Sequence, residues 1–143
     1  MRKRFLSSIA GALLIPCIAA GCAAVTETGK GLAGVSTKVL EDNRENAFRK
    51  TYPLDQAKCK EMVEELLADI KAYIYARSDK KKMLAFYVSE SDTTPVGIFF
   101  VPQDNGSTDV LVSSPSRYAK EVIADRIGAW FEKKQREADK GKQ

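Results

Sequence analysis

Two strands and the turn between them decide the fold of this chain: Val96-Gly97-Ile98-Phe99-Phe100-Val101, Asn105-Gly106 and Asp109-Val110-Leu111-Val112. Asn-Gly is a strong hairpin signal because both residues tolerate the positive φ that a type I′ turn requires. The first strand is almost continuously apolar, as expected of a strand that is covered on both faces. The sequence therefore predicts an antiparallel hairpin here.

Three further strands are predicted before this hairpin. Residues 72–77 and 83–89 flank the turn Ser78-Asp79-Lys80, and a polar loop ending at Pro95 joins the second of them to Val96. With the hairpin, these strands predict an antiparallel meander. Residues 46–52 alternate between two sides as a first strand, which ends at Pro53.

Two amphipathic helices are predicted, one before and one after the meander in the chain. Asp55 is the candidate N-cap of the first helix, and Ser114 caps the second with Pro115 at its first position. Apolar residues recur at three- and four-residue steps in both helices. The first stripe comprises Cys59, Met62, Val63, Leu66, Leu67 and Ile70. The second comprises Tyr118, Val122, Ile123, Ile127, Trp130 and Phe131.

The resulting element order is β-α-β-β-β-β-α. Two amphipathic helices need a common apolar surface, and a five-stranded antiparallel sheet provides one. We therefore expect a two-layer α+β domain with both helices on one face and the first strand paired beside the last. This order resembles a reduced helix-grip layout, as in the small domains of outer-membrane assembly lipoproteins; the resemblance is one of topology.

The domain is expected to span residues 44–132, between two segments of different composition. Residues 22–43 include three glycines and lack a strong periodicity, which is typical of a flexible tether; a short helix at 36–42 stays open as an alternative within it. Residues 133–143 mix charges without large apolar side chains, so we expect a disordered tail.

Residues 1–21 have the layout of a secretory signal peptide: Arg2-Lys3-Arg4 is a basic start, and a mostly apolar stretch ends in Ile18-Ala19-Ala20-Gly21-Cys22. This junction resembles the lipobox of bacterial lipoproteins. The resemblance implies cleavage between Gly21 and Cys22, a diacylglycerol on the Cys22 thiol and acyl chains such as palmitate. Stable anchoring takes more than one acyl chain, which such a modification provides.

Two other interpretations of this segment stay open, namely a plain secretion signal cleaved near Ala19 to Ala23 and a retained anchor helix. In lipoproteins of this kind, an Asp after the modified cysteine often directs retention in the inner membrane. Ala23 stands at that position. The resemblance therefore implies a lipid anchor in the outer membrane of the bacterial cell envelope, with the domain facing the periplasm.

The charge balance changes once the signal peptide is removed. The full chain carries 23 basic and 19 acidic side chains, a net charge of +4. Residues 1–21 hold three of the basic side chains and none of the acidic ones, so the mature chain has a net charge of +1. A nearly neutral domain lacks the basic footprint of nucleic-acid binding, and we expect no such partner.

Cysteine usage excludes an internal disulfide in the mature chain. If Cys22 carries the lipid, Cys59 is the only other cysteine after the signal peptide. Cys59 falls in a predicted helix, where a free cysteine usually acts as a small buried hydrophobe. A bridge between two chains or a reactive thiol remains the alternative, although no histidine is present to activate the sulfur.

The residue types required for common catalytic and metal sites are missing. The sequence has no histidine, which excludes Ser-His-Asp and Cys-His arrangements and imidazole metal sites. It has no Gly-rich phosphate loop. Asp104-Asn105-Gly106 lacks the ligand spacing of a calcium loop, and Glu90 with Asp92 is better explained as a solvated loop than as a cation site. We therefore predict a non-enzymatic protein without cofactor or metal.

Two surfaces are candidates for partners. If Leu84 and Phe86 face the helices, then Tyr75, Tyr87, Phe99 and Val101 lie on the opposite face of the sheet and could dock an envelope protein, a second copy or an apolar ligand. The alternative is a curved sheet whose two faces form one core.

The second candidate is a basic cluster around the first turn of the meander. Arg77, Lys80, Lys81 and Lys82 could contact anionic lipid headgroups. The alternative is a solvated hairpin whose lysines prevent edge pairing.

A wider resemblance covers most of the chain. The lipobox and tether, Tyr52-Pro53-Leu54-Asp55, the segment from Val88 to Gly97 and Ser113-Ser114-Pro115-Ser116 together resemble a family of small uncharacterised bacterial lipoproteins. That resemblance implies a fold and a cellular place rather than a reaction. We expect a lipid-anchored, non-catalytic interaction or structural module, or alternatively a binder of a small apolar or lipid ligand between sheet and helices.

Overall fold

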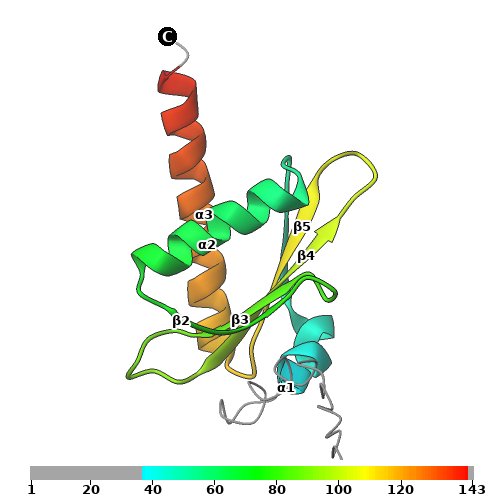
Figure 1. The fold of residues 1–143 in the computed structure, drawn as a ribbon, viewed down its shortest axis with the longest axis vertical. Helices are drawn as coiled ribbons and strands as arrows, with labels where there is room; N and C mark the ends of the chain where they lie inside the picture. Colours follow the sequence, from blue (N-terminus) through cyan, green and yellow to red (C-terminus); the bar gives the residue numbers. More distant parts are fainter. Residues whose placement is uncertain (1–36, 142–143) are drawn as a thin grey trace, which may run out of the picture.

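The computed structural model describes residues 37–141, in which five antiparallel strands form one sheet (Figure 1). The strand order is β1-β5-β4-β3-β2, so β1 pairs with β5 as predicted. The strand ends differ from the predicted ones by at most two residues. The strands are β1 (Phe48–Tyr52), β2 (Tyr73–Ser78), β3 (Met83–Tyr87), β4 (Pro95–Pro102) and β5 (Thr108–Ser113).

Helices α2 (Gln56–Asp69) and α3 (Arg117–Lys140) pack on one face of this sheet (Figure 1). The side chain of Asp55 accepts a hydrogen bond from Lys58 N at 2.8 Å, which confirms the predicted N-cap of α2. Alternate strand residues such as Leu84, Phe86 and Ile98 meet the helices and are completely buried. The two-layer α+β class is therefore confirmed, and we call this cluster the helix-side core.

A third helix, α1 (Thr37–Asp42), lies on the opposite face of the sheet and continues into the 3-10 helix η2 (Asn43–Asn46). Leu40 is completely buried there, and its carbonyl accepts a hydrogen bond from Ser113 Oγ at 2.7 Å. The residues that pack with Leu40 are Met83, Ala85, Phe99 and Leu111. This second cluster is separate from the helix-side core because the sheet lies between them.

Two expectations are wrong on this face. The predicted tether, residues 22–43, extends too far: the short helix considered at 36–42 is present as α1, and its Leu40 seals apolar side chains that α2 and α3 cannot reach from the other side. The sheet also does not fold both of its faces into one core. The expectation that Leu84 and Phe86 face the helices is confirmed, and Met83 and Ala85 alternate with them on the opposite face.

The start of α3 differs from the prediction. Ser116, not Ser114, is the N-cap, and its side chain accepts a hydrogen bond from Ala119 N at 3.2 Å. Ser114 instead donates its hydroxyl to Pro95 O at 2.8 Å and so ties the loop before α3 to β4. Tyr118 is 77% exposed and does not belong to the apolar stripe, whereas the neighbouring Ala119 is buried.

The predicted disordered tail at 133–143 is also wrong as far as the structure describes it, because α3 continues to Lys140 and projects beyond the rest of the domain (Figure 1). Strong helix formers fill this stretch, and propagation from an already packed helix avoids a new nucleation step. Lys134 also pairs with Glu65 of α2 at 2.8 Å.

The hairpin between β4 and β5 forms where it was predicted but with another turn. Gly106 has φ +79°, whereas Asn105 does not have a positive φ, so the turn is not of type I′. Gly106 N donates to Gln103 O at 3.1 Å. The Asn105 side chain accepts from both N and Oγ of Ser107, which stabilises a longer loop. No helix within residues 37–141 is long and apolar enough to cross a membrane.

Candidate functional site

The second face of the sheet carries three tyrosines at the open end of the β2–β3 hairpin, opposite the turn that joins the two strands. Tyr73 stands opposite Tyr87, and Tyr75, two residues farther along β2, lies on the same face and packs against the second core. The ring centroids lie 4.6 Å apart for Tyr75 and Tyr87 and 6.3 Å apart for Tyr73 and Tyr87. We call these three residues the tyrosine strip.

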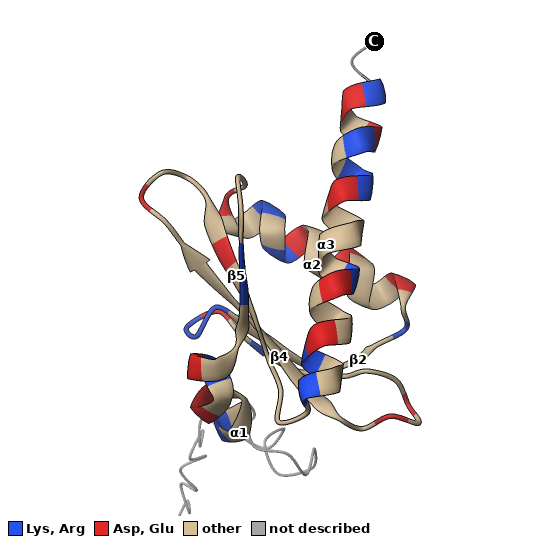
Figure 2. Ribbon diagram, turned by 180° about the vertical axis from the view of Figure 1, so that it is seen from behind, with Lys and Arg blue, Asp and Glu red and all other residues tan. Residues whose placement is uncertain are grey.

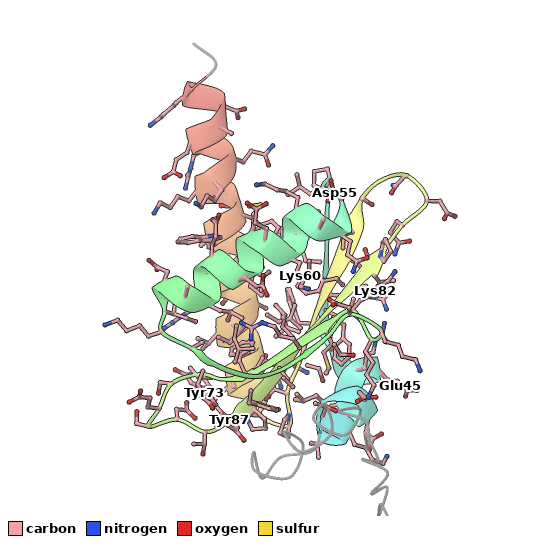
Figure 3. All side chains as sticks on the ribbon, viewed as in Figure 1. Glu45, Asp55, Lys60, Tyr73, Lys82 and Tyr87 are labelled. Atoms are coloured by element: carbon pink, nitrogen blue, oxygen red, sulfur yellow. The ribbon has the colours of Figure 1, made fainter. Side chains whose placement is uncertain are left out.

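Exposure decreases along the tyrosine strip. Tyr73 is 58% exposed and lies beside Tyr87 in Figure 3, whereas Tyr75 is half-buried. The Tyr75 hydroxyl is buried without a hydrogen-bond partner among the described residues. Burial, together with the nearby Tyr87, raises the pKa of Tyr75 to about 12. The strip therefore presents the exposed ring of Tyr73 to solvent at one edge of the sheet, with the partly buried Tyr87 and Tyr75 stacked behind it, since β2 is an edge strand.

The other residues predicted for this face behave differently. Phe99 is only 1% exposed, because it packs with Leu40 and the Arg44 guanidinium covers its ring. Phe99 is thus part of the second core rather than free surface. Val101 is partly exposed and lies farther along the same strand. The structure therefore separates the four predicted residues into an aromatic end and a basic end.

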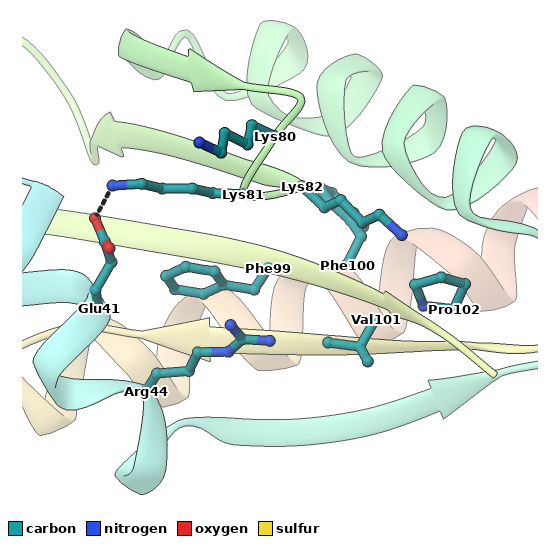
Figure 4. Close-up of a pocket in the computed structure, with 9 residues that line it drawn as sticks. All are labelled: Glu41, Arg44, Lys80, Lys81, Lys82, Phe99, Phe100, Val101 and Pro102. Carbon is teal, nitrogen blue, oxygen red and sulfur yellow. Dashed lines mark hydrogen bonds and ion pairs between the residues drawn. The ribbon is translucent and has the colours of Figure 1, made fainter.

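The basic end is a groove of about 360 Å³ between α1, η2 and the β2–β3 turn, which we call the basic groove (Figure 4). Its lining consists of Glu41, Arg44, Lys80, Lys81, Lys82, Phe99, Phe100, Val101 and Pro102. Lys81 Nζ lies 2.6 Å from Glu41 Oε1 and so joins the turn to α1. The pKa of Glu41 is lowered, chiefly by this hydrogen bond.

The structure brings the three predicted lysines together but places Arg77 elsewhere. Arg77 Nε lies 3.4 Å from Glu64 Oε1 of α2, on the helix side of the sheet. In its place, Arg44 of η2 joins the lysines from the second face. The turn between β2 and β3 stands out as a basic loop in Figure 2. Sequence reasoning missed Arg44 because it lies near the end of the supposed tether, remote in the chain from the lysines.

A polar cluster that the sequence did not suggest lies beside the basic groove. Asp109 of β5 is largely buried and accepts hydrogen bonds from Thr51 Oγ1 at 2.6 Å and Gln103 Nε2 at 3.1 Å. Arg49 NH1 approaches the same carboxylate at 3.8 Å. The signal that could have revealed it is an acidic residue opposite a threonine in paired strands. This cluster links β1 to β5 and to the loop between β4 and β5.

The thiol of Cys59 and the carboxylate of Asp92 are both engaged in the packing or hydrogen bonding of the fold. Cys59 is a free cysteine that is completely buried in α2, and burial raises the pKa of its thiol to about 11. Asp92 accepts a hydrogen bond from Thr94 N at 3.0 Å, and its pKa is lowered by its bonds to Thr94. Within residues 37–141, no three His, Cys, Asp or Glu side chains are grouped so that they could hold a metal ion.

The predicted lipidation site, Cys22, and the cleavage position after Gly21 lie outside the described residues. Residues 37–141 form a small α+β domain, and α1 packs on the second face of its sheet. No protein-family model matches the sequence, and no curated protein matches it.

Proposed function

We propose that the protein is a lipid-anchored, non-catalytic interaction module of the bacterial envelope, held in the outer membrane through Cys22 and facing the periplasm. The tyrosine strip is the surface that engages a partner protein in this proposal. The observation that carries it is the exposed ring of Tyr73 on edge strand β2, which stacks on the partly buried Tyr87.

The chemistry of the tyrosine strip favours a protein partner. A tyrosine ring buries a large apolar area with little loss of side-chain freedom and keeps a hydroxyl for hydrogen bonding, so tyrosine is enriched at protein interfaces. Tyr73 also lies on edge strand β2, where a partner gains access to both side chain and backbone. These properties favour an interface over a closed cavity.

The packing of the helix-side core favours a protein interface on the surface over a ligand held between the sheet and the helices. Phe86, Phe100 and Ile98 are almost completely buried and fill the space beneath α2 and α3. A cavity large enough for a lipid would remove such contacts from a small core, and empty core volume is destabilising. We therefore place the function on the surface.

The position of the anchor is compatible with such a role. Residues 23–36 separate Cys22 from Thr37 at the start of α1. A chain of this length spans at most about 50 Å when fully extended. A domain on this anchor would stay close to the membrane and still reach partners embedded in it or bound beside it.

A photo-crosslinking amino acid at position 73 tests the docking surface in cells. The matched control is the same substitution at Tyr118, which is 77% exposed but lies at the start of α3. We expect a discrete cross-linked product from position 73, either with another envelope protein or at the mass of two copies, and none from position 118. Equal cross-linking at both positions, or none at position 73, would contradict the proposal.

The anchor has its own test. Cells fed an alkyne analogue of palmitate should label the wild-type protein and not the Cys22→Ser variant, which should also leave the outer-membrane fraction. Cys59→Ser serves as the control, because a buried thiol is not expected to carry lipid. Continued labelling of Cys22→Ser would show that the anchor lies elsewhere or is absent.

A further inference from the structure

We propose that the basic groove binds a phosphate group, as carried by an anionic phospholipid headgroup or by a soluble phosphate compound. This site is distinct from the tyrosine strip, and it stands or falls independently of the protein docking proposed above. Its elements are the Arg44 guanidinium, the amines of Lys80 and Lys82, and the apolar floor beside them (Figure 4).

The charge of the groove is strongly positive although the mature chain is nearly neutral. Four cationic side chains line it and only one carboxylate, Glu41, which Lys81 already engages. Asp79, on the same turn, is 2.8 Å from Lys60 of α2, and Glu45 is not part of the lining. A net charge of +3 therefore remains among the lining residues, without another acid in the groove to neutralise it.

Arg44 is positioned before any ligand arrives. Its guanidinium carbon lies 4.8 Å from the centroid of the Phe99 ring, and Phe99 is fixed in the second core. Cation–π stacking of this kind uses the flat face of the guanidinium and leaves its N–H edge available. Among the described residues, no carboxylate or carbonyl accepts a hydrogen bond from that edge. The edge can therefore bind two oxygens of one anion.

The turn that carries the lysines is held rigidly against the groove. Lys82 has φ 50°, a left-handed conformation that is uncommon for a residue with a side chain. Its amide donates to Asp79 O at 3.1 Å, and its carbonyl accepts from Phe100 N at 2.9 Å. Backbone bonds on both sides thus fix the strained residue, and strain of this kind gathers at binding sites. Figure 4 shows Lys82 extending along the groove toward Pro102.

A phosphate matches this arrangement better than a carboxylate does. A phosphate monoester has three terminal oxygens, one more than a carboxylate, and a diester has two terminal oxygens on a tetrahedral centre together with two ester oxygens. Either can engage a bidentate arginine and a lysine at once. Val101 and Pro102 provide an apolar floor beside the charges, which can contact the carbon atoms of an organic substituent on the phosphate. The site therefore takes a phosphate group with a small organic substituent.

Nuclear magnetic resonance titration of the ¹⁵N-labelled full-length protein in a neutral detergent tests the site. The two probes are inorganic phosphate and glycerophosphoglycerol, which is the headgroup of phosphatidylglycerol without acyl chains, at constant ionic strength set with chloride. We expect saturable shifts of the Arg44 Nε–H and Lys82 amide signals. At least tenfold tighter binding of glycerophosphoglycerol assigns the site to lipid headgroups, and equal or tighter binding of inorganic phosphate assigns it to soluble phosphates.

Charge-matched variants decide whether the groove itself is responsible. Arg44→Gln with Lys82→Gln should weaken binding at least tenfold. Arg136→Gln with Lys140→Gln, at the projecting end of α3, removes the same charge and should change affinity less than twofold. If the first double variant unfolds early, Lys80→Gln and Lys82→Gln singly keep the Arg44 stack and should each weaken binding. Absence of saturable shifts, or equal weakening by both double variants, would overturn the proposal.

Discussion

At the residue scale, the approach of α1 to the sheet depends on one glycine. A glycine inside a strand normally weakens it, because it has no side chain to pack. A β-carbon at Gly97 would lie 3.1 Å from both Cβ and Cδ1 of Leu40, closer than ordinary packing contacts. Gly97 therefore allows Leu40 to sit directly on the strand and seal the second core.

Gly97→Ala should lower the free energy of unfolding by about 1–3 kcal/mol through overpacking against α1. In a Leu40→Ala background, the added loss should be clearly smaller, because Cδ1 is gone and α1 is free to shift. Urea unfolding of the four proteins in this cycle measures the coupling. Gly141→Ala, whose new β-carbon would have only ordinary contacts of 3.8 Å, should change stability little. Additive effects of Gly97→Ala and Leu40→Ala would contradict the close approach.

At the element scale, the start of α3 shows how neighbouring side chains select a cap. Ser114 and Ser116 both have the hydroxyl that a cap requires. Ser114 is committed to Pro95 of β4 and also accepts a hydrogen bond from Ser116 N at 3.1 Å. Ser116 is therefore the residue that remains to satisfy the free amide of Ala119.

Ser116→Ala should lower the free energy of unfolding by about 1 kcal/mol, because Ala119 N loses its acceptor at the helix start. Ser116→Asp should retain the stability, since a carboxylate accepts the same hydrogen bond and interacts favourably with the helix N-terminus. Thermal unfolding followed by circular dichroism compares the three proteins. Equal stability of Ser116→Ala and wild type would show that another group caps the helix.

At the scale of the whole molecule, the helix-side core contains two groups that titrate at alkaline pH. Tyr52 is 7% exposed and Cys59 is completely buried. Burial raises the pKa of Tyr52 to about 12 and that of Cys59 to about 11, from ordinary values of 10.0 and 9.0. The folded protein thus keeps both protons at a pH at which the unfolded chain releases them.

This difference gives the stability a defined pH dependence. The stabilisation that comes from keeping Tyr52 and Cys59 protonated is fully present below pH 9. It is lost as the pH rises through the pKa values of the folded protein, about 11 for Cys59 and about 12 for Tyr52. We expect a loss of a few kcal/mol between pH 9 and pH 11, measured by urea unfolding at each pH. Tyr52→Phe and Cys59→Ala should each flatten the curve, whatever their effect at pH 7. An unchanged slope in both variants would contradict the assignment.

Local signals were sufficient for most of the sheet and for α2. Asp55 caps α2 as predicted, the stripe from Cys59 to Leu67 is buried, and the strands occur in the expected order. Arg44 and Leu40 escaped prediction because each functions through a partner distant in the chain. Leu40 is also the only buried residue of a six-residue helix, which is too short to show a periodicity.

The sequence by itself determined the five strands, their antiparallel pairing, the side of the sheet that α2 and α3 cover and the lipobox-like junction at Cys22. These features depend on side-chain alternation, turn residues and short motifs, which act over a few residues. Only the tertiary structure decided that α1 covers the second face, that Phe99 is buried in the second core, and that Arg44 stacks on Phe99 beside the three lysines. The physical reason is that these contacts join segments far apart in the chain, whose meeting depends on the packing of the whole sheet.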